Sequence, residues 1–360
     1  MLEYFLFLVF AILLSMLFKP RKYGMYIVIV SLCLGILAFN MEVLPASDLT
    51  RHYSYVDMFR YHEVGLSYAL ERLNPVTMLY FWLFSFLPDN SFLPAISTFL
   101  CYYFMLKLAV KACDDAKMPK SVYITCFSII LMSYNFYVMS NSIRMWLVFS
   151  IFFYVLYDDV VRGRKRIVVW IIYLVLVFFH YGTLILLASR ILAMILKNIK
   201  KLNILQFVGL ILCACIGVAF MSTDYFSIYI IDKIIGYAEY TTRGTWQSII
   251  GLVRMGMVCG LIIPALRNVN EKYKEYLYVI IGVCLATLIL YKNYVMILRF
   301  GDAVIAASSI PIVCYYKKCL LNTQRNKNVL TIPQCFLWGG AILSYGAISF
   351  FDYQYLFFNI

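Results

Sequence analysis

Residues 2–40 read LEYFLFLVFAILLSMLFKPRKYGMYIVIVSLCLGILAFN. Two apolar runs, 2–18 and 23–40, are separated by a short break that holds Lys19, Arg21 and Lys22. An apolar run of about 20 residues has the length of a helix that crosses a bilayer, and basic residues between two such runs are typical of a cytoplasmic loop. The first run lacks the basic flank and cleavage site of a signal peptide. This stretch therefore predicts a helical hairpin that stays in a membrane.

Apolar runs of this kind continue along the chain. We predict further spans near 91–111, 121–139, 143–157, 166–180, 182–196, 202–220, 248–266, 275–291, 296–315 and 331–351. Of the 360 residues, 64% are hydrophobic and 14% charged, against about 45–50% and about 25% in soluble proteins. A soluble globular protein is thereby excluded. The predicted fold class is all-α: a polytopic integral membrane protein of about 12 transmembrane helices, or roughly 10 to 13, forming a single domain over 1–360.

The net charge of +13 lies in loops and forms no RNA-binding or DNA-binding motif, so we expect no nucleic-acid partner. Basic clusters occupy alternate loops: Lys19/Arg21/Lys22, Lys111/Lys117/Lys120, Arg162/Arg164/Lys165/Arg166, Lys197/Lys200/Lys201, Arg267/Lys272/Lys274 and Lys317/Lys318/Arg325/Lys327. Because positively charged loops stay in the cytoplasm, these loops are predicted to be cytoplasmic. Both termini then face outside.

This topology makes 40–90 one external segment. Its apolar part, from Pro75 to Pro88, is too short to cross a bilayer, and we interpret it as a re-entrant or interfacial helix. The alternative is a true span, which would place the basic cluster at 111–120 outside and break the alternation of charge.

Motifs for nucleotides and metals are missing from the sequence. There is no Walker loop and no Gly-x-Gly-x-x-Gly, and His52 and His62 lack the spacing of a metal site. We therefore expect no metal and no cofactor. None of the eleven cysteines falls in a predicted external loop, which disfavours a disulfide-linked external domain.

Three arginines occupy equivalent places. Arg144, Arg254 and Arg299 each follow the outer, N-terminal end of a predicted helix that runs inward. An ionisable residue in a membrane costs about 2.5–3.5 kcal/mol on insertion scales and is a functional candidate, and a cation at a helix N-terminus is unfavourable unless an anion lies nearby. One interpretation is an outward-facing pocket for phosphate or pyrophosphate. The other is internal pairing, since Asp302 stands three residues after Arg299.

Two other charged residues of the predicted spans, Arg190 and Lys292, are interpreted as interfacial, with side chains that reach out of the hydrocarbon region.

The external segment carries a second polar group of residues, with Asp48, Arg51, Tyr53 and Tyr55 within nine positions, 47–55. The spacing of Asp48 and Arg51 fits a capped helix start with a local ion pair. It equally fits a functional group, in which Asp48 accepts a proton from a hydroxyl, Arg51 binds a phosphate and the tyrosines stack on sugars.

His180 lies at the outward tip of the predicted hairpin 166–196 and is either a substrate contact or an ordinary helix terminus. Trp246, in a predicted external loop, is a third candidate sugar platform.

The order of these features resembles a known family. Two spans, an external Asp48-Leu49-x-Arg51-x-Tyr53 segment, a helix start at Ile143-Arg144, an apolar run ending in Phe179-His180, a late arginine at 299 and an aromatic tail at 351–355 are similar to the EpsG-like branch of the Wzy-type polysaccharide repeat-unit polymerases. The sequence has His52 where a tyrosine is common in that family, and Arg144-Met145-Trp146 in place of its usual Arg-Gln.

The resemblance implies a glycosyltransferase of the bacterial inner (cytoplasmic) membrane. It would polymerise undecaprenyl-pyrophosphate-linked oligosaccharide repeat units into a surface polysaccharide, such as O-antigen, capsule or exopolysaccharide. Arg144 and Arg299, with Arg51 and Arg254, would bind the pyrophosphate, and Asp48 or His180 would act on the attacking hydroxyl. Whether a chain-length regulator or a flippase binds the protein stays open.

Two alternatives remain. A transporter or flippase of lipid-linked anionic glycans would use the same arginines as a transit site, but such a protein usually has inverted repeats and broken midplane helices. A membrane-bound acyltransferase is the third, although the sequence lacks a histidine with a nearby acid deep in a span.

Overall fold

The computed structural model describes residues 2–43, 47–62, 64–72, 74–134, 136–164, 167–198, 245–266, 269–289 and 294–323. Every regular element in these ranges is helical, as the sequence predicts. The N-terminal part comprises α1 (Leu2–Leu17), the turn η1 (Pro20–Lys22), α2 (Tyr23–Phe39), α3 (Asp48–Arg60), α4 (Leu66–Glu71), α5 (Pro75–Ser85), α6 (Phe92–Asp115), α7 (Lys120–Ser133) and α8 (Phe136–Asn141). The remainder comprises α9 (Ile143–Leu156), the π-helical turn η2 (Tyr157–Val161), α10 (Ile167–Phe179), α11 (Thr183–Asn198), α14 (Thr245–Leu266), α15 (Glu271–Ile289), α16 (Tyr294–Ala306) and α17 (Ser309–Thr323).

Most of these helices coincide with predicted spans, but two predicted spans are broken. The span expected at 296–315 is divided into α16 and α17, because Pro311 has no N–H for a helical bond and its ring clashes with the carbonyl four residues earlier, at Ala307. The span expected at 121–139 is interrupted at Tyr134, whose carbonyl oxygen accepts a hydrogen bond from the Tyr102 hydroxyl at 3.0 Å. The spans predicted at 202–220 and 331–351 lie outside the described residues.

By length and composition, two helices of the described ranges could cross a bilayer, Pro20–Phe39 and Phe92–Asp115. Five further apolar helices are shorter, at 10–17 residues. The expected total of about 12 transmembrane helices therefore stays a prediction.

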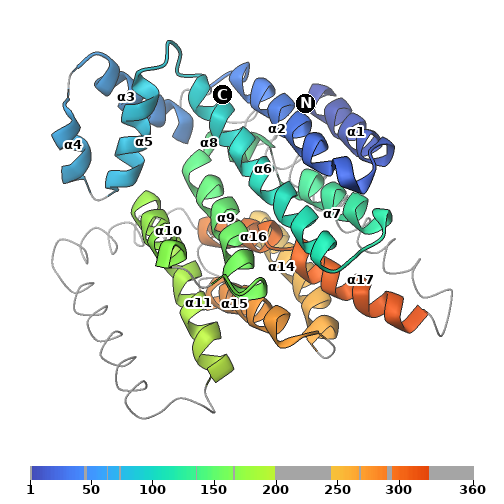
Figure 1. The fold of residues 1–360 in the computed structure, drawn as a ribbon. Coiled ribbons are helices and arrows are strands. Elements are labelled where there is room, and N and C mark those ends of the chain that lie inside the picture. Colours follow the sequence, from blue (N-terminus) through green and yellow to red (C-terminus); the bar gives the residue numbers. More distant parts are fainter. Residues whose placement is uncertain are drawn as a thin grey trace.

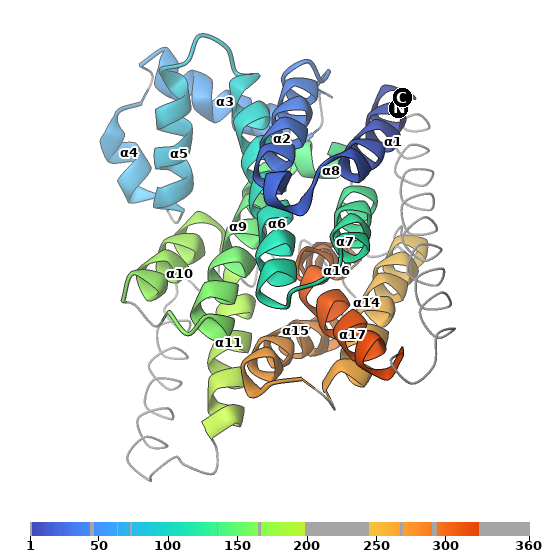
Figure 2. The same cartoon turned by 45° about the vertical axis from the view of Figure 1, so that its right-hand side comes forward.

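Helices α3, α4 and α5 form a lobe at one side of the molecule, beside α2 and α6 in both views of the fold (Figures 1 and 2). The lobe residues Leu49, Val56, Phe59, Ala69, Met78, Phe81 and Phe84 form a second apolar cluster of buried residues, which Leu93 of α6 and Ile143 of α9 complete. Helix α5 is the short apolar helix predicted from Pro75 to Pro88, and Thr77, Met78, Phe81 and Phe84 are buried within it. The larger cluster fills the space among the remaining helices.

The side chains of Met41 and Tyr80 pack against both clusters and so connect the lobe to the main bundle.

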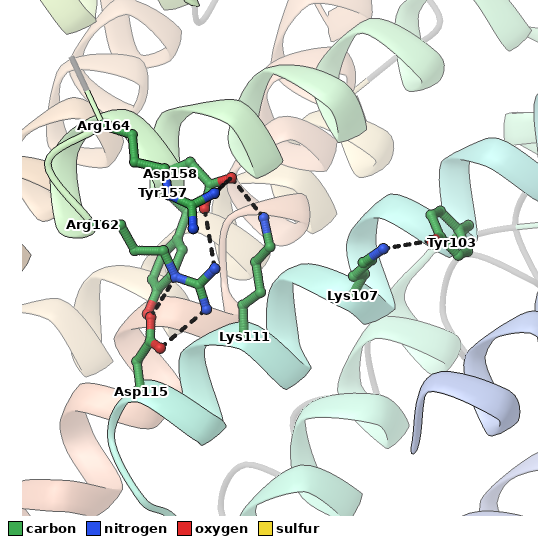
Figure 3. A network of polar contacts seen from close by, with 8 residues as sticks. All are labelled: Tyr103, Lys107, Lys111, Asp115, Tyr157, Asp158, Arg162 and Arg164. Carbon is green, nitrogen blue, oxygen red and sulfur yellow. Dashed lines mark hydrogen bonds and ion pairs between the residues drawn. The ribbon is translucent and has the colours of Figure 1, made fainter. Parts of the chain in front are cut away.

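The predicted basic loops meet at one end of the bundle. Asp158, just after α9, is the centre of a network that joins two of them, since Lys111 lies 2.8 Å, Arg162 3.6 Å and Arg164 3.9 Å from its carboxylate oxygens (Figure 3). Arg162 also pairs with Asp115 at 2.8 Å. Three further lysines make contacts between segments near these loops. Lys120 donates a hydrogen bond to the Met16 carbonyl and Lys318 donates one to the Pro264 carbonyl, while Lys197 forms an ion pair with Glu275. Loops that the charge pattern assigns to one side therefore lie together.

Candidate functional site

The site begins at the start of α3. Ser47 caps this helix, its hydroxyl oxygen accepting a hydrogen bond from the Thr50 N–H at 3.3 Å. The cap places Asp48 in the first turn, where a carboxylate is stabilised by the positive end of the helix dipole. The capped helix places Asp48 at its N-terminal end. This arrangement is compatible both with a local ion pair and with a functional role for Asp48.

The Asp48 carboxylate joins three parts of the chain. Its Oδ1 accepts a hydrogen bond from Arg51 Nη2 at 2.5 Å, the local pair that the spacing predicts. Its Oδ2 lies 3.9 Å from Arg299 Nη2 of α16 and accepts a 3.4 Å hydrogen bond from the hydroxyl of Ser142, which precedes α9. The structure therefore brings together two of the predicted arginines and the predicted acid.

His52 lies one turn after Asp48 on α3 and is almost fully buried, with 1% of its surface exposed. Its ring is 5.2 Å from that of Phe81, measured between centroids. Burial holds the pKa of His52 well below 6.5, and the nearby charges of Arg144, Arg51 and His180 lower it further. Arg144 and His180, the other two predicted contacts on α9 and after α10, therefore lie close enough to act on this imidazole.

His180 is fixed by its backbone and by its ring. Its carbonyl accepts a hydrogen bond from the Thr183 hydroxyl at 2.6 Å, and its Nδ1 accepts one from the Gly182 N–H at 3.2 Å. In the neutral imidazole an accepting Nδ1 leaves the proton on Nε2. The preceding carbonyl, of Phe179, accepts a hydrogen bond from the Thr77 hydroxyl of α5, which ties this turn to the lobe.

Tyr53 and Tyr55, which were proposed to stack on sugars, pack against apolar residues of the lobe. Tyr55 stacks on Phe81, with ring centroids 5.9 Å apart and planes 6° apart. Tyr53 is half-buried against the same cluster, and burial raises its pKa above 10.0. At least one face of the Tyr55 ring is thus covered by protein.

The prediction that Trp246 lies in an external loop was wrong, because α14 begins at Thr245 and Trp246 is in its first turn. Arg254 lies two to three turns along the same helix, and whether this helix spans a membrane stays a prediction. The side chains of these two residues are outside what the structure describes, so their relation to Asp48 stays a prediction.

Arg190 was predicted to reach out of the hydrocarbon region, and this was wrong. Its side chain is 3% exposed and pairs with Asp159 at 2.8 Å and with Glu275 at 3.0 Å. Asp159 also accepts a hydrogen bond from the Tyr173 hydroxyl at 3.4 Å. The residue is a buried link among η2, α10, α11 and α15, at the opposite end of α9 from Ser142.

His52 is the residue of this site that the sequence analysis did not select. Its spacing of four from Asp48 was the available signal, since residues four apart lie on one helix face. Its burial depends on α5, however, and no pattern within α3 shows which face α5 covers. Within the described residues, no group of three or more His, Cys, Asp and Glu side chains is placed to hold a metal ion.

No family model matches the chain, and comparisons with curated proteins and with solved structures likewise find no match.

Proposed function

We propose that this protein is a membrane-embedded glycosyltransferase that polymerises lipid-linked oligosaccharide repeat units, with undecaprenyl pyrophosphate as the lipid carrier. The observation that supports it best is the convergence at Asp48, where Arg51, Ser142 and Arg299 lie together. Arg144 and His180 are near enough to influence the adjacent His52. Arg51, Arg144 and Arg299 carry guanidinium groups, which suit a pyrophosphate. These three arginines come from helices that are far apart in sequence.

The exposed faces of the helices support a place in the bilayer. On α2 the exposed residues Met25, Val28, Leu32 and Ile36 follow the spacing of one helix face. Exposed apolar residues are also frequent on α10: Ile167, Val168, Trp170, Ile171, Leu174, Val175 and Phe178. Soluble monomers rarely expose contiguous apolar surfaces of this kind, whereas helices that face lipid do so along their length.

The charge distribution supports an orientation. Ser142 precedes α9 and lies in the Asp48 site, whereas Asp158 follows α9 and lies among the basic loops. Helix α9 has 14 residues and so separates these groups by about 21 Å. If the basic loops are cytoplasmic, as the positive-inside rule expects, the site faces outward, where lipid-linked repeat units are polymerised. We place the protein in the bacterial inner membrane, with both termini outside.

The proposed chemistry is a displacement at the anomeric carbon of the lipid-linked glycan. A hydroxyl of the acceptor glycan forms the new C–O bond and gives up its proton, while the bond to the pyrophosphate breaks and its electron pair leaves with the lipid pyrophosphate. Arg51, Arg144 and Arg299 would stabilise the charge that develops on the leaving group. Asp48 or His180 would orient the hydroxyl or accept its proton.

The test is reconstitution of the purified protein with undecaprenyl-pyrophosphate oligosaccharides extracted from cells of the same organism. We expect longer lipid-linked glycans to form without nucleotide, and an Arg144→Ala variant of equal abundance to form none. If the substrate crosses the bilayer but is not extended, the protein is a flippase and the arginines are a transit site. If neither happens with matched substrate, both proposals are wrong.

A further inference from the structure

The buried imidazole of His52 is the feature that the proposed chemistry does not use. Both of its ring nitrogens lack a hydrogen-bond partner among the described residues, although only 1% of the residue is exposed. A buried polar group without a partner is destabilising because its hydration is lost and not replaced, and such groups in native structures are usually explained by a function or a ligand. The unpaired nitrogens of His52 therefore mark a place where a ligand atom is expected.

The charges around His52 show what kind of ligand fits. Two guanidinium groups act on the ring, Arg51 of its own helix and Arg144 at the start of α9, and the His180 imidazole lies in the turn after α10. Helix α5 contributes the apolar Phe81 ring and contains no charged residue. The nearest acid on α3, Asp48, already contacts Arg51 and Arg299 through its two oxygens. An anion that reaches this position would meet a surplus of cations.

We propose that His52 is a direct ligand of the bound phosphate group. Its ring is neutral in the free protein and takes up a proton from solvent when the anion binds. Neutral imidazole offers one N–H donor and one acceptor, whereas imidazolium offers two donors. Only the charged form gives both nitrogens a favourable place beside an anion. This inference rests on the proposed function, because it assigns the regulation of the same site.

The electrostatics give the direction of the effect. In the free protein, burial and the neighbouring cations hold the pKa of His52 well below 6.5, so the ring is neutral at pH 7. A bound pyrophosphate compensates those cations and favours the charged ring, which raises the pKa. Binding then consumes a proton between the two pKa values, and a rise in pH weakens binding there. The site would thus hold its anionic substrate more tightly in acidic surroundings.

The probe is citronellyl-pyrophosphoryl N-acetylglucosamine, added to the full-length protein in lipid nanodiscs. Both phosphates of this probe are esterified, so it lacks the phosphate proton with a pKa of about 6 found in monoesters. Calorimetry in two buffers of different ionisation enthalpy counts the protons taken up. For the wild type we expect about one proton at pH 7, and a dissociation constant that rises about tenfold per pH unit.

His52→Gln keeps a hydrogen-bonding side chain that does not titrate, and we expect it to bind the probe without proton uptake and without pH dependence. His62→Asn is the matched control, since His62 is exposed and has a φ of 58°, which asparagine tolerates. It should behave as the wild type. Unchanged uptake in His52→Gln, or uptake lost only in His180→Asn, would overturn the proposal.

Nuclear magnetic resonance of the wild type provides a test without substitution. The chain has three histidines, so isotope-labelled imidazoles give three resolvable signals. The signal of the buried ring should change from neutral to charged when the probe binds, and a ring that stays neutral overturns the inference. If the probe binds with proton uptake but glycans are not extended, the polymerase proposal fails alone. If glycans are extended and His52 stays neutral, this inference fails alone.

Discussion

Asp48 has a near arginine and a distant one, and the two have different roles. Arg51 is 57% exposed and reaches the carboxylate from the same helix, whereas Arg299 reaches it from α16 at 3.9 Å. An exposed local pair stabilises a protein by about 0–1 kcal/mol, so the pair with Arg51 alone gives little reason to place an acid here. The convergence of Asp48 with Arg299 and Ser142 is what makes this residue a functional candidate.

Replacing Asp48 with Asn should lower glycan extension by about 100-fold or more, the usual effect of removing a group that handles the reacting proton. Asp57→Asn is the matched control, since Asp57 pairs with Arg60 at the same spacing on the same helix, at 2.9 Å. We expect that variant to keep its activity. Extension rates in nanodiscs at equal protein abundance measure both effects. Equal loss in the two variants would mean that α3 needs its ion pairs only for folding.

Gly182 controls the position of the His180 ring. A Cβ atom at Gly182 would lie 2.9 Å from His180 Nδ1, so an alanine displaces the ring and removes its hydrogen-bond geometry. We expect Gly182→Ala to slow extension by about 10- to 100-fold, the cost of a misplacement near 1 Å in a catalytic group. Gly24→Ala, at a position with no atom within 4 Å, should have no effect. An active Gly182→Ala variant beside an inactive His180→Ala variant would contradict this role for Gly182.

At the scale of elements, the helices are joined by buried polar contacts as well as by apolar packing. Arg190 of α11, Asp159 of η2 and Glu275 of α15 are each at most 6% exposed at their side chains. Bringing such charges out of water is costly, and only the complete set balances the cost. The elements at this end of the bundle are therefore held in one arrangement.

Removing Arg190 should destabilise the protein strongly, because it leaves two buried carboxylates without this partner. We expect Arg190→Leu to lower the free energy of unfolding by about 3–5 kcal/mol. Arg164→Leu removes an arginine that is 57% exposed and 3.9 Å from Asp158, and should cost less than about 1 kcal/mol. Thermal melting in detergent compares the two. Similar melting temperatures would show that the Arg190 network does not stabilise the fold.

At the scale of the whole molecule, the two ends of α9 differ in charge and in proposed environment. The orientation follows from single cysteines in a cysteine-free background. Ser54→Cys, on an exposed position of α3, should react with an impermeant thiol reagent added to intact cells. Arg164→Cys should react only after the membrane is made permeable. The reverse pattern would place the Asp48 site in the cytoplasm and refute polymerisation on the outer face.

The sequence predicts most helix positions because each apolar run is a local property. The breaks at Tyr134 and Ala307 were not predicted: a tyrosine hydroxyl from another helix supports the first, and Pro311 acts four residues upstream at the second. At the site, too, local features were predictable from the sequence and contacts between helices were not. The pair of Asp48 with Arg51 is a matter of spacing, whereas the burial of His52 and of Arg190 depends on residues of other helices.

The contact between Asp48 and Arg299 has a consequence for synthesis of the chain. The two residues are 251 positions apart (299 − 48), so the ribosome must complete most of the protein before they can meet. Until then Asp48 has Arg51 within one helical turn, and its charge is compensated from the moment that α3 forms. A partly synthesised chain thus holds a neutralised acid and an incomplete site, and the proposed site is complete only when α16 has formed and packed against α3.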